Sequence, residues 1–159
     1  MSSNCSREKM VGLIRFRPPR IALTCLAAAA GLHVLSPEGT VLFLPYHLLG
    51  MLMLVCGFTV MIWAWTLFKK KETALCLPKD AALLIQEGPY RFTRNPMYLG
   101  MALMLCGAAF LFGSVIAFSA PGAFLITINE VFIPFEERNL ERLFGDSYLE
   151  YKESVRRWL

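Results

Sequence analysis

The chain has 159 residues, of which 56% are hydrophobic and 18% charged, and its mean hydropathy is +0.50. The length is that of one domain, and the composition is too apolar for a disordered chain or an ordinary soluble domain. We therefore expect a single all-α membrane domain over residues 1–159, an integral membrane helical bundle with no room for a separate soluble nucleotide-binding domain.

The distribution of the basic residues predicts how the chain lies in the membrane. The net charge of +4 comes from 16 Lys and Arg against 12 Asp and Glu. Bases occur before residue 21, between residues 69 and 98 and after residue 135, and the other connections have none. The positive-inside rule then predicts cytoplasmic N- and C-termini and an even number of spans. Because the bases flank apolar segments, we expect the lipid bilayer as the partner and no nucleic acid. The expected location is a bacterial inner membrane, with the endoplasmic reticulum as the alternative.

The N-terminal part predicts two spans. A basic segment, 1–20, precedes the apolar segment 21–35, which is shorter than the roughly 20 residues of a usual span. A cleaved signal peptide is an alternative reading of this start. The second span, 45–68, carries no charge, and its Gly50 and Gly57 lie near one helix face, where they would allow close approach of another helix.

The C-terminal part predicts a cytoplasmic loop, a helical hairpin and a surface helix. After the loop 69–95, the third span covers 96–112, with Asn95 as its N-cap, and the fourth covers 115–133, with Pro134 ending it. The charged stretch 136–159 is predicted to be a cytoplasmic C-terminal helix against the membrane, broken at Gly145.

Asn129 and Glu130 are the polar residues that the fourth apolar segment must accommodate. An ionisable residue inside a span indicates a functional site by default, because burying its charge is costly. The alternative is that Glu130 lies in the headgroup layer or pairs with an Arg of the middle loop. Both interpretations remain open from the residues alone.

The hairpin is predicted to bring two polar stretches to one cytoplasmic spot. Tyr98 lies near its start and Glu136 just after its end, so Tyr, Arg and carboxylate side chains would gather beside a helix N-terminus. The same residues also suit any helix that enters a membrane, with a capping Asn and an interfacial Tyr. The pattern alone therefore does not separate a binding site from a membrane boundary.

Two motifs give this region a specific resemblance. GPYRFTRNPMYLG at 88–100 and EERNLERLFGDSYLEYKESVRRWL at 136–159 resemble the isoprenylcysteine carboxyl methyltransferase family of integral membrane enzymes. The resemblance implies S-adenosylmethionine as the cofactor and methyl transfer to a lipophilic acceptor delivered by the membrane. It also implies that the stretch 82–85 borders the cofactor and that the binding residues are Ile85, Tyr90, Asn95, Pro96, Met97, Tyr98 and Glu136.

The chain departs from the family pattern at two positions. Asn95 stands where the family's R-H-P-x-Y motif has His, and Phe132 stands where the prenylcysteine enzymes carry an Arg suited to a carboxylate. We therefore do not assume a prenylcysteine carboxylate as the acceptor. The expected catalytic residues are Arg94, Glu130 and Glu137, with Asn129 and Phe132 binding the substrate.

Two other functions remain as alternatives. Membrane sterol reductases are similar in this half of the chain and use NADPH, whose phosphate Arg91, Arg94, Arg138 and Arg142 could bind. A scaffold or lipid-binding protein without enzymatic activity would also explain the helices and basic flanks.

The five cysteines form no CxxC pair and no metal-ligand spacing with His33 or His47, so no metal is expected.

Overall fold

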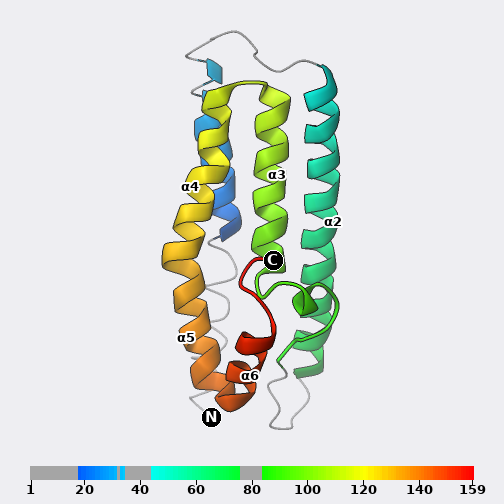
Figure 1. The fold of residues 1–159 in the computed structure, drawn as a ribbon, viewed down its shortest axis with the longest axis vertical. Helices are drawn as coiled ribbons and strands as arrows, with labels where there is room; N and C mark the ends of the chain where they lie inside the picture. Colours follow the sequence, from blue (N-terminus) through cyan, green and yellow to red (C-terminus); the bar gives the residue numbers. More distant parts are fainter. Residues whose placement is uncertain (1–17, 32, 35–43, 76–83) are drawn as a thin grey trace.

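The computed structural model describes residues 18–31, 33–34, 44–75 and 84–159, which form helices and turns and contain no β-strand. The first helix, residues 18–31, lies behind α4, while α2 (Leu44–Leu75), α3 (Pro96–Phe112) and α4 (Ser119–Thr127) run side by side (Figure 1). The predicted all-α class is confirmed for this part of the chain. Of the predicted basic segment, 1–20, the part before residue 18 lies outside the described residues.

The first two helices differ from their predicted bounds. The first is already helical at Pro18, ahead of the predicted start at residue 21, and residue 35 lies outside the described part. α2 continues beyond the predicted end at residue 68 as far as Leu75. The run Lys-Lys-Lys-Glu-Thr-Ala-Leu is built mostly of good helix formers, so the helix extends past the apolar segment and the predicted loop 69–95 is shortened.

α3 has the predicted bounds, and its end follows from one glycine. Gly113 has φ +66°, a left-handed conformation that glycine adopts without strain, and its N–H donates to Ala109 O at 3.2 Å. A 3-10 turn, η2 (Val115–Phe118), then leads directly into α4. This tight connection makes α3 and α4 the hairpin that the sequence predicts.

The fourth predicted span is part of a longer helix. α4 passes into a π-helical turn, η3 (Ile128–Phe132), and then into α5 (Ile133–Phe144). The prediction that Pro134 ends the helix is wrong. A proline ring clashes with a carbonyl one turn earlier in a regular α-helix, and the preceding π turn displaces those carbonyls.

The chain after α5 turns back toward the start of α3. Gly145, with φ +54°, breaks the helix as predicted, and α6 (Asp146–Ser154) follows. The predicted helix over 136–159, broken at Gly145, ends earlier than expected, because residues 155–159 are not helical. In Figure 1 this red segment runs from α6 to the lower end of α3.

Paired glycines join α2 to α3. A Cβ on Gly57 would lie 2.6 Å from Gly100 O, and a Cβ on Gly50 would lie 2.8 Å from Gly107 O. Real Cβ atoms do not approach backbone oxygens so closely, so the two antiparallel helices touch through their backbones. The packing role predicted for Gly50 and Gly57 is confirmed, with Gly100 and Gly107 as their partners.

The hydrophobic core lies between the first helix and the α3/α4 hairpin. Phe124, Ile128 and Ile133 are fully buried there, with Ile21 and Leu26 of the first helix packed against the same cluster. α2 instead exposes a row of large apolar side chains, among them Leu48, Leu52, Val55 and Phe58.

Two of the described helices are long and apolar enough to cross a membrane. They cover Pro45–Lys70 and Val115–Phe144, and Pro96–Phe112 is a shorter apolar helix. Large exposed apolar surfaces of this kind are unusual in a soluble monomer and suit contact with lipid.

Candidate functional site

The loop before α3 is held against α2 and α6. Gly88 has φ +60° and begins the 3-10 turn η1 (Gly88–Arg91), where an added Cβ would lie 3.2 Å from Leu67. The hydroxyl of Tyr151 on α6 donates to the backbone carbonyl of Tyr90 at 2.7 Å. These contacts place the first of the two motifs beside the lower ends of α2 and α3 (Figure 1).

A hydrogen bond links the two motifs directly. Tyr98, in the first turn of α3, donates its hydroxyl to Glu136 Oε1 on α5 at 2.5 Å. The residues are 38 positions apart, and Tyr98 is only 7% exposed. The hairpin thus brings the end of the first motif to the start of the second, as the sequence predicts.

A second link joins Arg94 to Glu137. Arg94 Nη1 lies 3.1 Å from Glu137 Oε1, and both side chains are almost completely shielded from solvent. A buried carboxylate is tolerated when it is paired with a cation and accepts hydrogen bonds. The neighbouring residues Glu136 and Glu137 therefore have different partners, a tyrosine hydroxyl and a guanidinium.

Asn95 is the N-cap residue of α3, as predicted, but its side chain does not cap the helix. It occupies the N-cap position without a side-chain capping bond, and its Nδ2 donates to Arg157 O at 3.1 Å. Pro96 follows at the first helical position, where its missing N–H costs no hydrogen bond. The Asn95 amide therefore bonds to the backbone carbonyl of Arg157 instead of to a backbone group of α3.

Residues Thr93, Arg157 and Trp158 meet at this place, although the sequence interpretation did not select them. Thr93 Oγ1 donates to Arg157 O at 3.0 Å, and Trp158 Nε1 donates to Asn129 Oδ1 at 3.3 Å. The only sequence signal was the pair of arginines beside a tryptophan at 156–158, which a surface helix explains equally well.

The π turn η3 carries Asn129 and Glu130 at the edge of an open groove. The groove is lined by Leu125, Ile126, Asn129, Glu130 and Trp158. Asn129 Nδ2 donates to Glu130 Oε1 at 2.8 Å, and Glu130 is exposed. Phe132, by contrast, packs against the hydrophobic core. Of the two predicted catalytic carboxylates, Glu130 is thus exposed and Glu137 is buried.

Tyr90 contributes a buried hydroxyl with no hydrogen-bond partner among the described residues. Burial is the main cause that raises the pKa of Tyr90, and nearby Tyr151 and Glu136 raise it further. The hydroxyl therefore stays protonated near neutral pH and can donate a hydrogen bond to a ligand. Ile85 and Met97 are half-buried in the same loop and at the start of α3.

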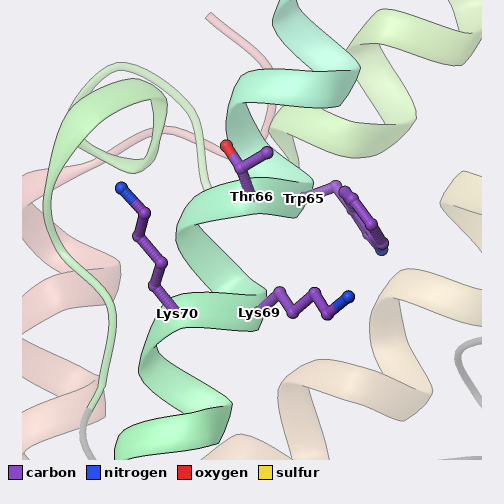
Figure 2. Close-up of a pocket in the computed structure, with 4 residues that line it drawn as sticks. All are labelled: Trp65, Thr66, Lys69 and Lys70. Atoms are coloured by element: carbon purple, nitrogen blue, oxygen red, sulfur yellow. The ribbon is translucent and has the colours of Figure 1, made fainter.

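The lower end of α2 presents a different surface. Trp65, Thr66, Lys69 and Lys70 line a shallow pocket there, and Figure 2 shows Trp65 and Lys69 extending to the same side of the helix. Lys69 Nζ lies 5.1 Å from the centre of the Trp65 ring, a cation–π distance. Aromatic and basic side chains at one level are typical of a membrane–water interface. None of the predicted site residues lines this pocket.

Comparison with known proteins identifies a family for this chain. A family model described as phospholipid methyltransferase matches residues 45–147. A methanethiol S-methyltransferase of Bradyrhizobium diazoefficiens is 36% identical over 66 residues, which are 42% of this chain and 22% of that protein. A protein-S-isoprenylcysteine O-methyltransferase of Arabidopsis thaliana is 35% identical over 75 residues, 45% of this chain and 36% of that protein.

Other comparisons add less about activity. An uncharacterised protein of Haemophilus influenzae is 41% identical over 63 residues, which are 40% of this chain and all of that protein. The matches to the two named methyltransferases cover well under two thirds of those enzymes. No solved structure matches the chain at a significant level.

Proposed function

The chain belongs to the phospholipid methyltransferase family, and we propose that it transfers a methyl group from S-adenosylmethionine to a lipophilic acceptor at the cytoplasmic face of a membrane. The observation that carries the proposal is the hydrogen bond between Tyr98 and Glu136, which joins the two motifs of the resemblance at one buried place. The two named relatives are both methyltransferases.

The residues around this bond fit a polar, charged donor. Tyr90 offers a buried hydroxyl without a partner among the described residues, and the Glu136 carboxylate lies close enough to affect its pKa. Asn95, Pro96 and Met97 form the adjoining start of α3, whose free amides favour a carboxylate. We assign these residues, with Ile85, to binding the donor.

The groove at η3 fits the acceptor side of the reaction. Its apolar wall is Leu125 and Ile126, and Ile126 is 67% exposed on the outer surface of a helix apolar enough to span a membrane. A lipophilic acceptor could therefore reach the groove laterally from the bilayer. Asn129 and Glu130 would meet its polar end.

The reaction asks little of the protein beyond positioning and exclusion of water. S-adenosylmethionine, when bound, supplies an electrophilic methyl group and departs as a neutral thioether that needs no proton. The Arg94–Glu137 ion pair holds the loop before α3 against α5, and both charged side chains are almost completely shielded from solvent. For an amine or alcohol acceptor, Glu130 would accept the proton that the nucleophile loses.

Binding of S-adenosylhomocysteine, the product of the donor, tests the assignment. We expect the purified protein to bind it in calorimetry, and Tyr98→Phe and Glu136→Gln to weaken binding by roughly tenfold, the effect of losing a buried hydrogen bond. Tyr46→Phe, on an exposed tyrosine of α2, is the matched control and should bind as the wild type does. Unchanged binding in both site variants, or binding of NADPH instead, contradicts the proposal.

Transfer itself is tested with labelled S-adenosylmethionine and separate acceptors: phospholipid vesicles, prenylated thiols, small thiols and amines. We expect label in at least one class, and Glu130→Gln to slow transfer to an amine more than transfer to a thiol, because a thiolate needs no base at the site. Label in none of the classes would contradict the catalytic proposal even if the donor product binds.

A further inference from the structure

The segment Arg156–Trp158 lies across both halves of the candidate donor site. Its backbone carbonyls accept hydrogen bonds from the preceding loop: Arg156 O from Arg94 N–H at 3.0 Å, and Arg157 O from Thr93 and Asn95. Thr93 is only 2% exposed, and its hydroxyl oxygen also accepts the Asn95 N–H at 3.2 Å. The loop that leads into α3 is thus fixed by a segment more than sixty residues away.

The side chains of the same segment reach the opposite wall. Arg157 Nη2 and Nε donate to the Glu137 carboxylate at 2.9 and 3.3 Å, and Nη1 approaches Asn129 Oδ1 at 3.4 Å. Trp158 Nε1 donates to that same Asn129 oxygen. A planar guanidinium can bridge a carboxylate and an amide in this way, whereas a lysine ammonium cannot reproduce the geometry.

We propose that Arg156–Trp158 is a positioning strap, in which Thr93 and Arg157 set the distance between the loop before α3 and the α5 wall and thereby the affinity for the donor. The inference rests on the proposed donor site, and the strap itself lies beyond residues 45–147, the part of the chain that the family model matches. Thr93 holds the loop in position by its hydrogen bond to Arg157 O. Arg157 positions Glu136 indirectly, because it binds the adjacent residue Glu137.

Coupling between the strap and the donor must be reciprocal. If the strap raises donor affinity, the donor must stabilise the strap by the same free energy. Trp158 reports on this directly, because its indole bonds to Asn129 and partly lines the groove. If the strap had only a structural role, its variants would change the thermal stability of the protein, but binding of the donor would not stabilise the strap.

The test measures the affinity for S-adenosylhomocysteine in a series of variants. Thr93→Val removes the hydroxyl and Arg157→Gln removes the bridge, and each should weaken binding by roughly tenfold. Thr93→Ser keeps the hydroxyl and should restore wild-type affinity. Arg20→Gln removes an equal charge from an exposed arginine of the first helix and should have no effect.

The second arm follows Trp158 emission in a Trp63→Phe, Trp65→Phe background during titration with S-adenosylhomocysteine. We expect a saturable change with the calorimetric dissociation constant. Wild-type affinity in Arg157→Gln, or constant Trp158 emission while the ligand binds, overturns the strap proposal; if Thr93→Val fails to fold, these two results decide. Absence of binding to the wild-type protein would instead overturn the donor site itself.

Discussion

The hydroxyl groups of Tyr98 and Tyr151 connect elements that are distant in sequence. Tyr98 bonds to Glu136 on α5, and Tyr151 bonds to the carbonyl of Tyr90 in η1. Each buried hydroxyl satisfies an acceptor that would otherwise lose its contact with water on folding, which is why removing one side of the pair is costly. The aromatic rings contribute packing, and the hydroxyls determine which elements meet.

Tyr151→Phe should lower stability by about 1 kcal/mol near neutral pH, because one buried hydrogen bond is lost. Burial, with Tyr148 nearby, raises the pKa of Tyr151 to about 12. The folded state therefore favours the protonated hydroxyl, whose contribution is complete below the unfolded pKa near 10 and is lost as the pH rises toward 12.

Thermal unfolding in detergent at several pH values checks this prediction. We expect the difference between the wild type and Tyr151→Phe to be largest below pH 10 and to shrink between pH 10 and 12. Tyr46→Phe should follow the wild type throughout, since Tyr46 is exposed on α2. A difference that grows with alkaline pH would contradict the direction of the shift.

At the scale of elements, backbone contact between α2 and α3 positions the start of the site. The pairs Gly57–Gly100 and Gly50–Gly107 allow the two helices to touch along their length. Small residues that permit such approach are a common basis of helix association in membranes, where burial of apolar surface gives little driving force. The site loop then packs against the lower end of α2 through Gly88.

Gly57→Ala should destabilise the fold by about 1–3 kcal/mol, because its Cβ would overlap Gly100 O and force the helices apart. Gly122→Ala is the matched control, since a Cβ there meets no atom within 4 Å. We expect the control to be neutral or more stable, as alanine is the better helix former. The transition midpoints of the two purified variants in detergent give the comparison, and equal midpoints would contradict tight packing at Gly57.

The π turn η3 determines which contacts its polar residues can make. It places Asn129 where the strap can bond to it, and leaves Glu130 exposed beside the groove. Single π turns inside α-helices occur frequently at functional sites. The alternative in which Glu130 pairs with an Arg of the middle loop receives no support, because its hydrogen bond within the described residues is with Asn129.

At the scale of the whole molecule, the site and the interfacial side chains lie at one end. Trp63 packs beside Gly88, and Lys69 and Lys70 follow on the same helix. We propose four spans, with this end in the cytoplasm and the α3–α4 connection on the other side. The asymmetry of the basic residues supports that orientation.

Labelling with a membrane-impermeant maleimide tests the orientation. In a background with all five cysteines replaced by alanine, Val115→Cys at the far turn should react in intact cells. Ser147→Cys on α6 should react only after permeabilisation. Both positions are exposed, so access to the reagent is limited by the membrane alone. Reaction of both from the same side would contradict the proposed topology.

Much of this protein follows from the sequence by itself. Composition predicts an all-helical membrane chain, Pro96 and Gly113 mark both ends of α3, and the motifs at 88–100 and 136–159 indicate a membrane methyltransferase family, which the comparisons confirm. These features depend on local rules: helix breakers, hydrophobic length and motif spacing act on neighbouring residues. The pairing of Tyr98 with Glu136 was also within reach, because a tight hairpin fixes which ends meet.

Only the tertiary structure decided how the site is enclosed. It redirected Asn95 from capping to the strap, carried the helix through Pro134 by a π turn, and brought Thr93 and Arg157 into the site. For Thr93 and Asn95 the physical reason is a remote hydrogen-bond acceptor, the backbone carbonyl of Arg157. The sequence around Asn95 is compatible both with capping α3 and with bonding to the strap, and the carbonyl of Arg157 determines which of these hydrogen bonds Asn95 makes.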